Sequence, residues 1–229
     1  MTKHEQASKR PRRRVQRANG AETRRKLLAT ALALFSDGGY KATSLRSIAS
    51  QTGVDLATLK YHFGDKSQLF AEVYRQGHEE FIVQVQPLFA GMAQVTTREE
   101  LREQIRALVL GVHRYLDAHM DFARLALYRV MEDGSEISDV EEELQGVAIG
   151  VLDGVLQKLV DRAIIRPLDT RAFLAFLVTS VPVWFVTCAV KPGWVGDPVP
   201  GRSPEGRRRS EAFLQDMLER MLLAEGSHT

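Results

Sequence analysis

Apolar residues recur with a helical period along most of the chain, and no stretch shows the period of two that is typical of strands. The pattern is clearest over residues 42–63. Leu45 and Ile48 fall on one face of a short helix there, and Leu59 and Phe63 fall on one face of a second. The chain is therefore expected to be all-α.

Cap and turn residues separate these two short helices. Ser44 is predicted to cap the first helix, Gly53 lies where the chain reverses, and Asp55 is predicted to cap the second. This arrangement describes a helix-turn-helix, whose second helix enters the major groove of DNA. The second helix would present six side chains outward or sideways: Leu56, Ala57, Thr58, Lys60, Tyr61 and His62.

Further helices follow from the same reasoning. A helix from about 22 to 37 should stop at Gly38-Gly39. One that starts at Asp65 should run through about Phe89 and end near Pro87. Thr97 and Glu100 form a capping box, and Ser203-Pro204 opens the last helix. The remaining helices are expected over about 121–132, 138–163 and 170–190.

Charge divides the chain into two parts. Residues 1–66 hold 14 Lys and Arg against 5 Asp and Glu, whereas the remainder holds 17 against 24. A basic end joined to an acidic body favours nucleic-acid binding through the basic end. Residues 1–20 are basic and polar without apolar periodicity, so they are expected to be disordered in isolation. They either reach the DNA or form a solvated tail.

Catalytic and metal-binding motifs are lacking in the sequence. There is no H-E-x-x-H, P-loop, G-x-S-x-G or Cys/His cluster, so we expect neither an enzyme nor a metal or cofactor. The single cysteine, Cys188, fits a reducing cytoplasm and a buried position. Residues 172–190 are uncharged and nearly long enough to span a membrane, but we expect a buried helix there and no membrane partner.

Three motifs within Thr23–Phe70 resemble the N-terminal domain of TetR-type transcriptional regulators. They are F-x-x-x-G-Y-x-x-T-S from Phe35 to Ser44, G-V-x-x-x-T-L from Gly53 to Leu59, and Y-H-F-x-x-K from Tyr61 to Lys66. One position departs from the family, because Lys60 stands where a tyrosine is common.

The resemblance implies a domain organisation and a function. After the disordered basic arm at 1–20, it implies a DNA-binding domain at 21–66 and a helical ligand-binding and dimerisation domain at 67–229. The implied protein is a cytoplasmic repressor. It binds double-stranded DNA as a homodimer at a near-palindromic operator, and a small-molecule effector releases it. The alternative is an architectural or non-specific DNA-binding protein.

The resemblance also suggests roles at the DNA. Backbone contacts are expected from Thr43, Thr58, Tyr61, His62 and Lys66, with Ser44 at the cap. Base contacts are expected from Arg46, Leu56, Ala57 and Lys60, although Arg46 could instead pair with Asp55 and Lys60 could instead bind phosphate.

The effector would enter a pocket among the body helices. Aromatic residues supply its lining and a few polar residues its anchors, although each is also explained as ordinary core or structure. The candidates are Phe81, Phe89, His113, Phe122, Arg124, Tyr128, Arg129, Phe176 and Trp184.

Overall fold

The computed structural model describes residues 9–131, 138–190 and 204–223, with side chains except at 9–18, 129–131, 138, 141 and 188–190. All regular structure in these ranges is helical, which confirms the all-α prediction. The helices are α1 (Lys9–Ala42), α2 (Leu45–Thr52), α3 (Leu56–Phe63), α4 (Lys66–Ala93), α5 (Arg98–Ala118), α6 (Met120–Met131), α7 (Ser138–Asp161), α8 (Thr170–Val190) and α9 (Pro204–Leu222).

Helices α1, α2 and α3 form a small N-terminal domain around one apolar core. Leu27 and Phe35 of α1, Ile48 of α2 and Leu59 of α3 are all fully buried. The ring of Phe35 meets the edge of Phe70, at the start of α4, with centroids 4.9 Å apart. This aromatic contact joins the domain core to the helix that leads into the body.

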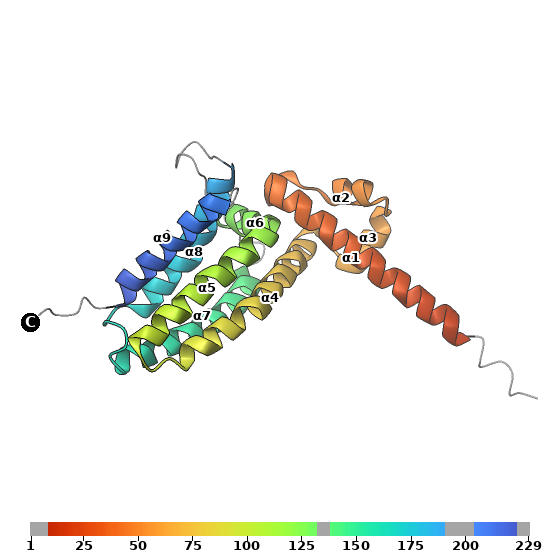
Figure 1. Cartoon of the computed structure of the whole chain (residues 1–229). Helices are drawn as coiled ribbons and strands as arrows, with labels where there is room; N and C mark the ends of the chain where they lie inside the picture. The colour runs from red at the N-terminus through yellow and green to blue at the C-terminus, as the bar shows by residue number, and fades with distance from the viewer. Residues whose placement is uncertain (1–8, 132–137, 191–203, 224–229) are drawn as a thin grey trace, which may run out of the picture.

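Helix α1 is longer than the sequence predicted. It begins at Lys9 instead of about Glu22 and extends past the domain (Figure 1). Pro11 is tolerated because it lies in the first turn, where backbone N–H groups have no helical partner. The predicted stop at the glycine pair is a break at Gly39, which has φ 76°, followed by a short helical return to Ala42. Residues 1–8 lie outside the described ranges.

Helix α4 links the domain to the body, and it continues through the expected stop at Pro87 to Ala93. A proline inside a helix removes the hydrogen bond to the carbonyl four residues earlier. That carbonyl belongs to Val83, a residue that is 67% exposed. The helix continues past this missing hydrogen bond.

Helices α4 to α9 pack side by side as the body (Figure 1). The capping box predicted for Thr97 and Glu100 is present at the start of α5. The predicted cap at Ser203, the loops at 133–135 and 191–203, and the Cys188 side chain lie outside the described part.

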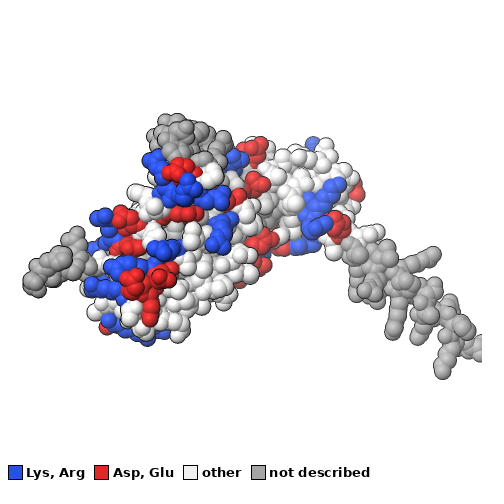
Figure 2. All heavy atoms as spheres, viewed as in Figure 1, with Lys and Arg blue, Asp and Glu red and all other residues white. Residues whose placement is uncertain are grey.

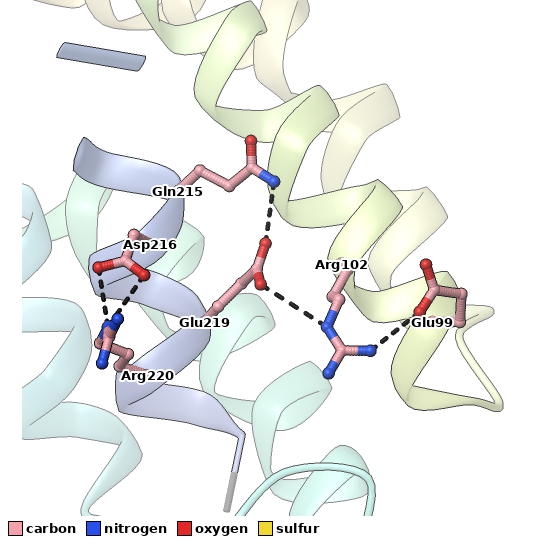
Figure 3. Close-up of polar contacts among 6 residues, drawn as sticks. All are labelled: Glu99, Arg102, Gln215, Asp216, Glu219 and Arg220. Atoms are coloured by element: carbon pink, nitrogen blue, oxygen red, sulfur yellow. Dashed lines mark hydrogen bonds and ion pairs between the residues drawn. The ribbon is translucent and has the colours of Figure 1, made fainter. Parts of the chain in front are cut away.

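Helix α9 is held against α5 by polar contacts near its C-terminal end (Figure 3). Glu219 of α9 lies 3.6 Å from the Arg102 guanidinium of α5 and accepts a hydrogen bond from Gln215 at 2.9 Å. Arg102 also pairs with Glu99 at 2.9 Å, within its own helix. One arginine therefore joins the two helices while its own position is fixed by Glu99.

Candidate nucleic-acid interface

Helix α2 is fixed at both ends by local hydrogen bonds. The Ser44 hydroxyl accepts a hydrogen bond from the Ser47 N–H at 3.0 Å, and the Ser47 hydroxyl accepts one from the Ser44 N–H at 3.1 Å. Gly53 ends the helix with φ 68° and ψ 18°, a left-handed conformation that suits glycine. The predicted cap and turn are therefore confirmed. Ser44 itself is exposed, so it can also face DNA.

Helix α3 begins at the predicted cap, Asp55. One carboxylate oxygen accepts from the Thr58 N–H at 2.8 Å, and the other accepts from the Thr58 hydroxyl at 2.6 Å. These hydrogen bonds lower the pKa of Asp55. The Thr58 hydroxyl proton is therefore used in a hydrogen bond within the protein. Only the lone pairs of its oxygen remain, and they can accept hydrogen bonds from other molecules.

The outer face of α3 carries the candidate DNA contacts. Leu59 and Phe63 are buried, as predicted, and fix which side of the helix faces out. The ring of Tyr61 is 86% exposed, the largest exposure among the exposed large apolar side chains. Lys60 is exposed beside it, Ala57 is exposed, and Leu56, Thr58 and His62 are half-buried.

Tyr61 and His62 lie edge to face, with ring centroids 5.6 Å apart. Neither ring is fully buried in the apolar core. The ring and hydroxyl of Tyr61 are therefore accessible to another molecule.

Two residues expected to touch the DNA backbone face the protein instead. Thr43 is 6% exposed, and its hydroxyl donates to the carbonyls of Gly39 at 2.8 Å and Leu34 at 3.1 Å. The Lys66 ammonium donates to the carbonyls of Tyr40 at 2.9 Å and Thr43 at 3.0 Å. It also lies 4.1 Å from the Tyr40 ring centroid. Both residues hold the segment before α2 in place.

Arg46 is exposed on α2, and no ion pair joins it to Asp55 among the described side chains. Asp55 is occupied by Thr58 instead. The alternative role considered for Arg46 is therefore not seen, and its guanidinium is exposed for an outside partner.

Two basic residues that the sequence did not single out support these helices. Lys26 of α1 donates to the Thr52 carbonyl at the end of α2 at 2.7 Å. Arg24 lies 5.2 Å from the centroid of the Phe63 ring and pairs with Glu72 of α4. Because both contacts join residues distant in sequence, local spacing gave no signal for them. Figure 2 shows a patch of basic side chains on the N-terminal domain, and further basic side chains on the body.

The effector candidates in the body are spread over several environments. The ring of Phe81 meets that of Tyr115, and Phe122 is buried against α4. The Tyr128 hydroxyl donates to the carbonyl of Asp37, which joins α6 to α1. Phe176 is 46% exposed on α8. Phe89 and Arg124 are half-buried, and the side chain of Arg129 lies outside the described part.

His113 and Trp184 stand out because each has a buried ring nitrogen without a hydrogen bond. His113 is 1% exposed, and its Nε2 lies 3.1 Å from the Ser210 hydroxyl, whereas its Nδ1 has no partner. Burial lowers the pKa of His113 to about 4, and Arg207 adds to this effect. Trp184 stacks on Phe213 at 5.6 Å, and its Nε1 is also unpartnered. Buried polar atoms normally have partners.

The nine candidates do not converge on one enclosed cavity. Of them, only Phe122 lines the cleft of about 330 Å³ that lies between α1, α4 and the α5–α6 corner. Among the residues described, no group of three or more His, Cys, Asp or Glu side chains could hold a metal ion.

Comparison with known proteins identifies the N-terminal domain. Residues 27–73 match the family model for bacterial regulatory proteins of the TetR family. The transcriptional regulator AcrR of Shigella flexneri is 36% identical over 98 residues, 42% of this chain and 46% of AcrR. The match thus spans about half of that relative's length.

Solved structures extend the likeness to the body as fold alone. The ketosteroid transcriptional regulator KstR2 of Mycobacterium tuberculosis superposes with a TM-score of 0.64 at 16% identity, over 88% of this chain and 95% of that one. A Saccharomonospora viridis regulator, solved in complex with choline, gives 0.63 at 18% identity, over 90% and 100%. The chain therefore carries, at residues 27–73, the DNA-binding domain of the TetR family of bacterial transcriptional regulators, on a helical body with the fold of such regulators.

Proposed function

We propose that the protein is a repressor that binds a near-palindromic DNA operator as a homodimer and is released by a small-molecule effector. The observation that carries the proposal is the outer face of α3, where Tyr61 is 86% exposed beside the exposed Lys60. A capped helix that presents an ammonium, a phenol and an imidazole offers donors for phosphate oxygens and base edges.

The homodimer is supported by apolar residues that the chain leaves uncovered on two neighbouring helices. Val147 and Val151 of α7 are 70% and 61% exposed, and Phe176 and Val183 of α8 are 46% and 41% exposed. The Thr170–Thr187 window of α8 is apolar enough to span a membrane, yet only 28% of it is buried. A second copy of the same two helices would cover these residues.

The glycines of α7 would allow that copy to approach closely. Gly146, Gly150 and Gly154 follow one another at intervals of four, and nothing lies within 4 Å of a Cβ built on any of them. A two-fold axis along this face would place the two copies of α3 about one turn of DNA apart, about 34–36 Å.

The effector is proposed to bind in the body near α5, α8 and α9. The unpartnered Nδ1 of His113 and Nε1 of Trp184 both lie in this region, and the Phe185 ring contacts His113 at 4.4 Å. A ligand with hydrogen-bond acceptors would satisfy a buried Trp N–H, which water does not reach. Release of DNA requires the effector to bind the DNA-incompetent conformation more tightly.

Competition binding distinguishes the repressor from the architectural alternative. An operator would first be selected from random DNA, and its binding then measured at fixed salt against excess random DNA. A repressor retains the operator, because specific sites are typically about 10³–10⁷ times tighter than non-specific ones. Equal competition by random DNA would favour the architectural protein.

The effector can then be sought by thermal-shift screening. The substrates of the enzymes encoded beside the gene are the first compounds to test. We expect the protein in the cytoplasm, and its recovery in a washed membrane fraction would contradict that expectation and make α8 a membrane span instead.

A further inference from the structure

The cleft between α1, α4 and the α5–α6 corner lies where the DNA-binding domain meets the body. Its volume is about 330 Å³, at the lower end of the range for small-molecule sites. One wall consists of α1 residues around Leu28 and Leu32, and the opposite wall consists of α4 and the corner, with Gly77 and Phe122. A molecule in this cleft would touch both domains at once.

The body wall of the cleft is rigid. The Tyr115 hydroxyl donates to the carbonyl of Gly77 at 3.0 Å, and the His119 ring stacks on Tyr115 with centroids 4.2 Å apart. Phe122 packs so closely on Gly77 that a Cβ there would lie 2.2 Å from the Phe122 ring. Because this wall is already ordered, ligand binding loses little conformational entropy there.

The rim of the cleft carries more negative than positive groups. Glu80, Asp117 and Asp121 line it, with Arg25 as the single Lys or Arg side chain. The Arg25 guanidinium is already paired with Glu22 at 2.8 Å, on the exposed side of α1. Figure 2 shows acidic side chains along the junction of the two domains.

The three carboxylates differ in how far the protein satisfies them. Asp117 is ion-paired through its buried Oδ2, which lies 2.8 Å from the Arg207 guanidinium, and burial raises the pKa of Asp117 while Arg207 lowers it. Glu80 accepts one hydrogen bond from Gln76 at 3.0 Å. Neither Glu80 nor Asp121 forms an ion pair with any described side chain.

The buried part of the cleft lining is apolar, because Leu28, Val73 and Phe122 are all buried there. Its acidic groups do not converge on a metal ion among the described residues. An occupant that suits both features has an apolar body and a positive end with N–H donors. Phe122 can also interact with such a cation through its ring.

We propose that this cleft is a second effector site, separate from the one proposed among α5, α8 and α9, and that it takes a small organic cation with an apolar body. Such a ligand fixes the position of α1 against the corner, and thereby the angle between the DNA-binding domain and the body. Its influence on DNA rests on the proposed repressor function, whereas its binding does not.

Calorimetry without DNA tests the binding. The probe is benzylamine, which is protonated at pH 7, and its neutral counterpart is benzyl alcohol. We expect saturable binding of benzylamine and at least about tenfold weaker binding of the alcohol, since one charge-assisted contact is worth about this factor. No saturable binding of benzylamine, or equal binding of the two, would overturn the proposal.

Matched variants locate the site. Glu80→Gln combined with Asp121→Asn should weaken benzylamine binding by at least about tenfold, whereas Glu79→Gln, an exposed carboxylate outside the cleft, should leave it unchanged. Ala29→Trp should fill the cleft, and Ala33→Trp, one turn further along α1 and also exposed, should not. Equal binding by Ala29→Trp and Ala33→Trp would place the ligand elsewhere.

Operator affinity at saturating benzylamine tests the effector role. We expect a change of about fivefold or more, and the operator must change benzylamine affinity by the same factor. An unchanged operator affinity would overturn the effector role. If the protein selects no operator at all, the repressor proposal fails while the calorimetric result still decides whether the cleft binds the cation.

Discussion

Lys60 and Lys66 lie six residues apart, and their side chains have different environments. Lys66 donates to two carbonyls of the segment before α2, so Lys66→Ala should lower the free energy of unfolding by about 1–3 kcal/mol. Lys60 is exposed, so Lys60→Ala should change it by less than about 0.5 kcal/mol. Urea unfolding of both variants measures the difference, and equal losses would contradict it.

The same two variants distinguish a role in supporting the fold from a role in base recognition. Selection from randomised operators should show that Lys60→Ala relaxes the preference at one base pair in each half-site, a loss of about 1–3 kcal/mol in discrimination. Lys60→Tyr, which restores the residue common in the family, should shift that preference. If Lys60→Ala keeps the parent preference, Lys60 binds phosphate, and specificity rests on Arg46, Leu56 and Ala57.

His113 should make stability depend on pH. Its pKa is about 4 in the folded protein and about 6.5 in an unfolded chain, so the unfolded state binds more protons between these values. The stabilisation from neutral His113 is complete above about pH 6.5 and is lost as the pH falls towards 4. Between pH 7 and 5 the free energy of unfolding of the parent protein should fall by about 1–2 kcal/mol more than that of His113→Leu.

Denaturant unfolding at both pH values measures this loss. A His113→Leu variant that is as pH-dependent as the parent would show that other groups cause the effect.

At the residue scale, the sequence predicted which side chains lie on and around α3 but not always which way they face. Lys60 and Tyr61 are exposed as expected, because the buried Leu59 and Phe63 fix the orientation of α3. The Lys66 ammonium points inward because it donates to the Tyr40 carbonyl. Tyr40 lies 26 residues earlier in the chain. Contacts of that separation leave no periodic signal in a single sequence.

At the scale of helices, two positions share a left-handed backbone but differ in residue. Gly53 has φ 68° at the turn after α2, and Ala163 has φ 56° after α7. A Cβ in this conformation costs about 1 kcal/mol or more. Gly53→Ala should therefore destabilise the protein by about that amount, and Ala163→Gly should stabilise it.

Because nothing lies within 4 Å of a Cβ at Gly53, any loss in that variant comes from the backbone alone. Thermal unfolding of the two variants checks the opposite signs. A stable Gly53→Ala protein would mean that the turn changes conformation, which altered operator binding would reveal.

Helix caps were predictable because their partners lie within three or four residues. Ser44, Asp55 and Thr97 all cap the helices predicted for them. The ends of longer helices were not predictable in this way, since α4 passes Pro87, whose missing hydrogen bond falls at the exposed residue Val83. The exposure of that residue depends on the packing of the whole body, which the local sequence does not determine.

At the scale of the whole molecule, the homodimer proposal needs a test position on α7 that is exposed within one chain. Leu156 is 6% exposed and Leu152 packs against the core within one chain. A charge there would disrupt the monomer itself. The exposed Val151 is the better position.

Val151→Glu should give a monomer that has lost operator binding, because the charge would be buried between the two copies. Val83→Glu on α4 is the matched control, since Val83 is 67% exposed and Val151 is 61% exposed. Light scattering at micromolar concentration measures the oligomeric state. A parent protein that is already a stable monomer would contradict the homodimer.

The basic N-terminal residues either contact DNA or only aid solubility, and salt dependence distinguishes the two. Because α1 begins at Lys9, deletion of residues 1–20 would also remove helical turns. Replacing Arg12, Arg13 and Arg14 with glutamine instead removes three cations and keeps good helix formers.

If these cations neutralise phosphates, the slope of log K against log salt should become shallower by up to about 2.7, at about 0.9 for each cation. Affinity should fall alike for the operator and for random DNA, because phosphates carry no sequence information. Filter binding over a salt series measures both quantities. An unchanged slope would show that the three arginines do not touch DNA, and the whole electrostatic contribution would then come from the helix-turn-helix.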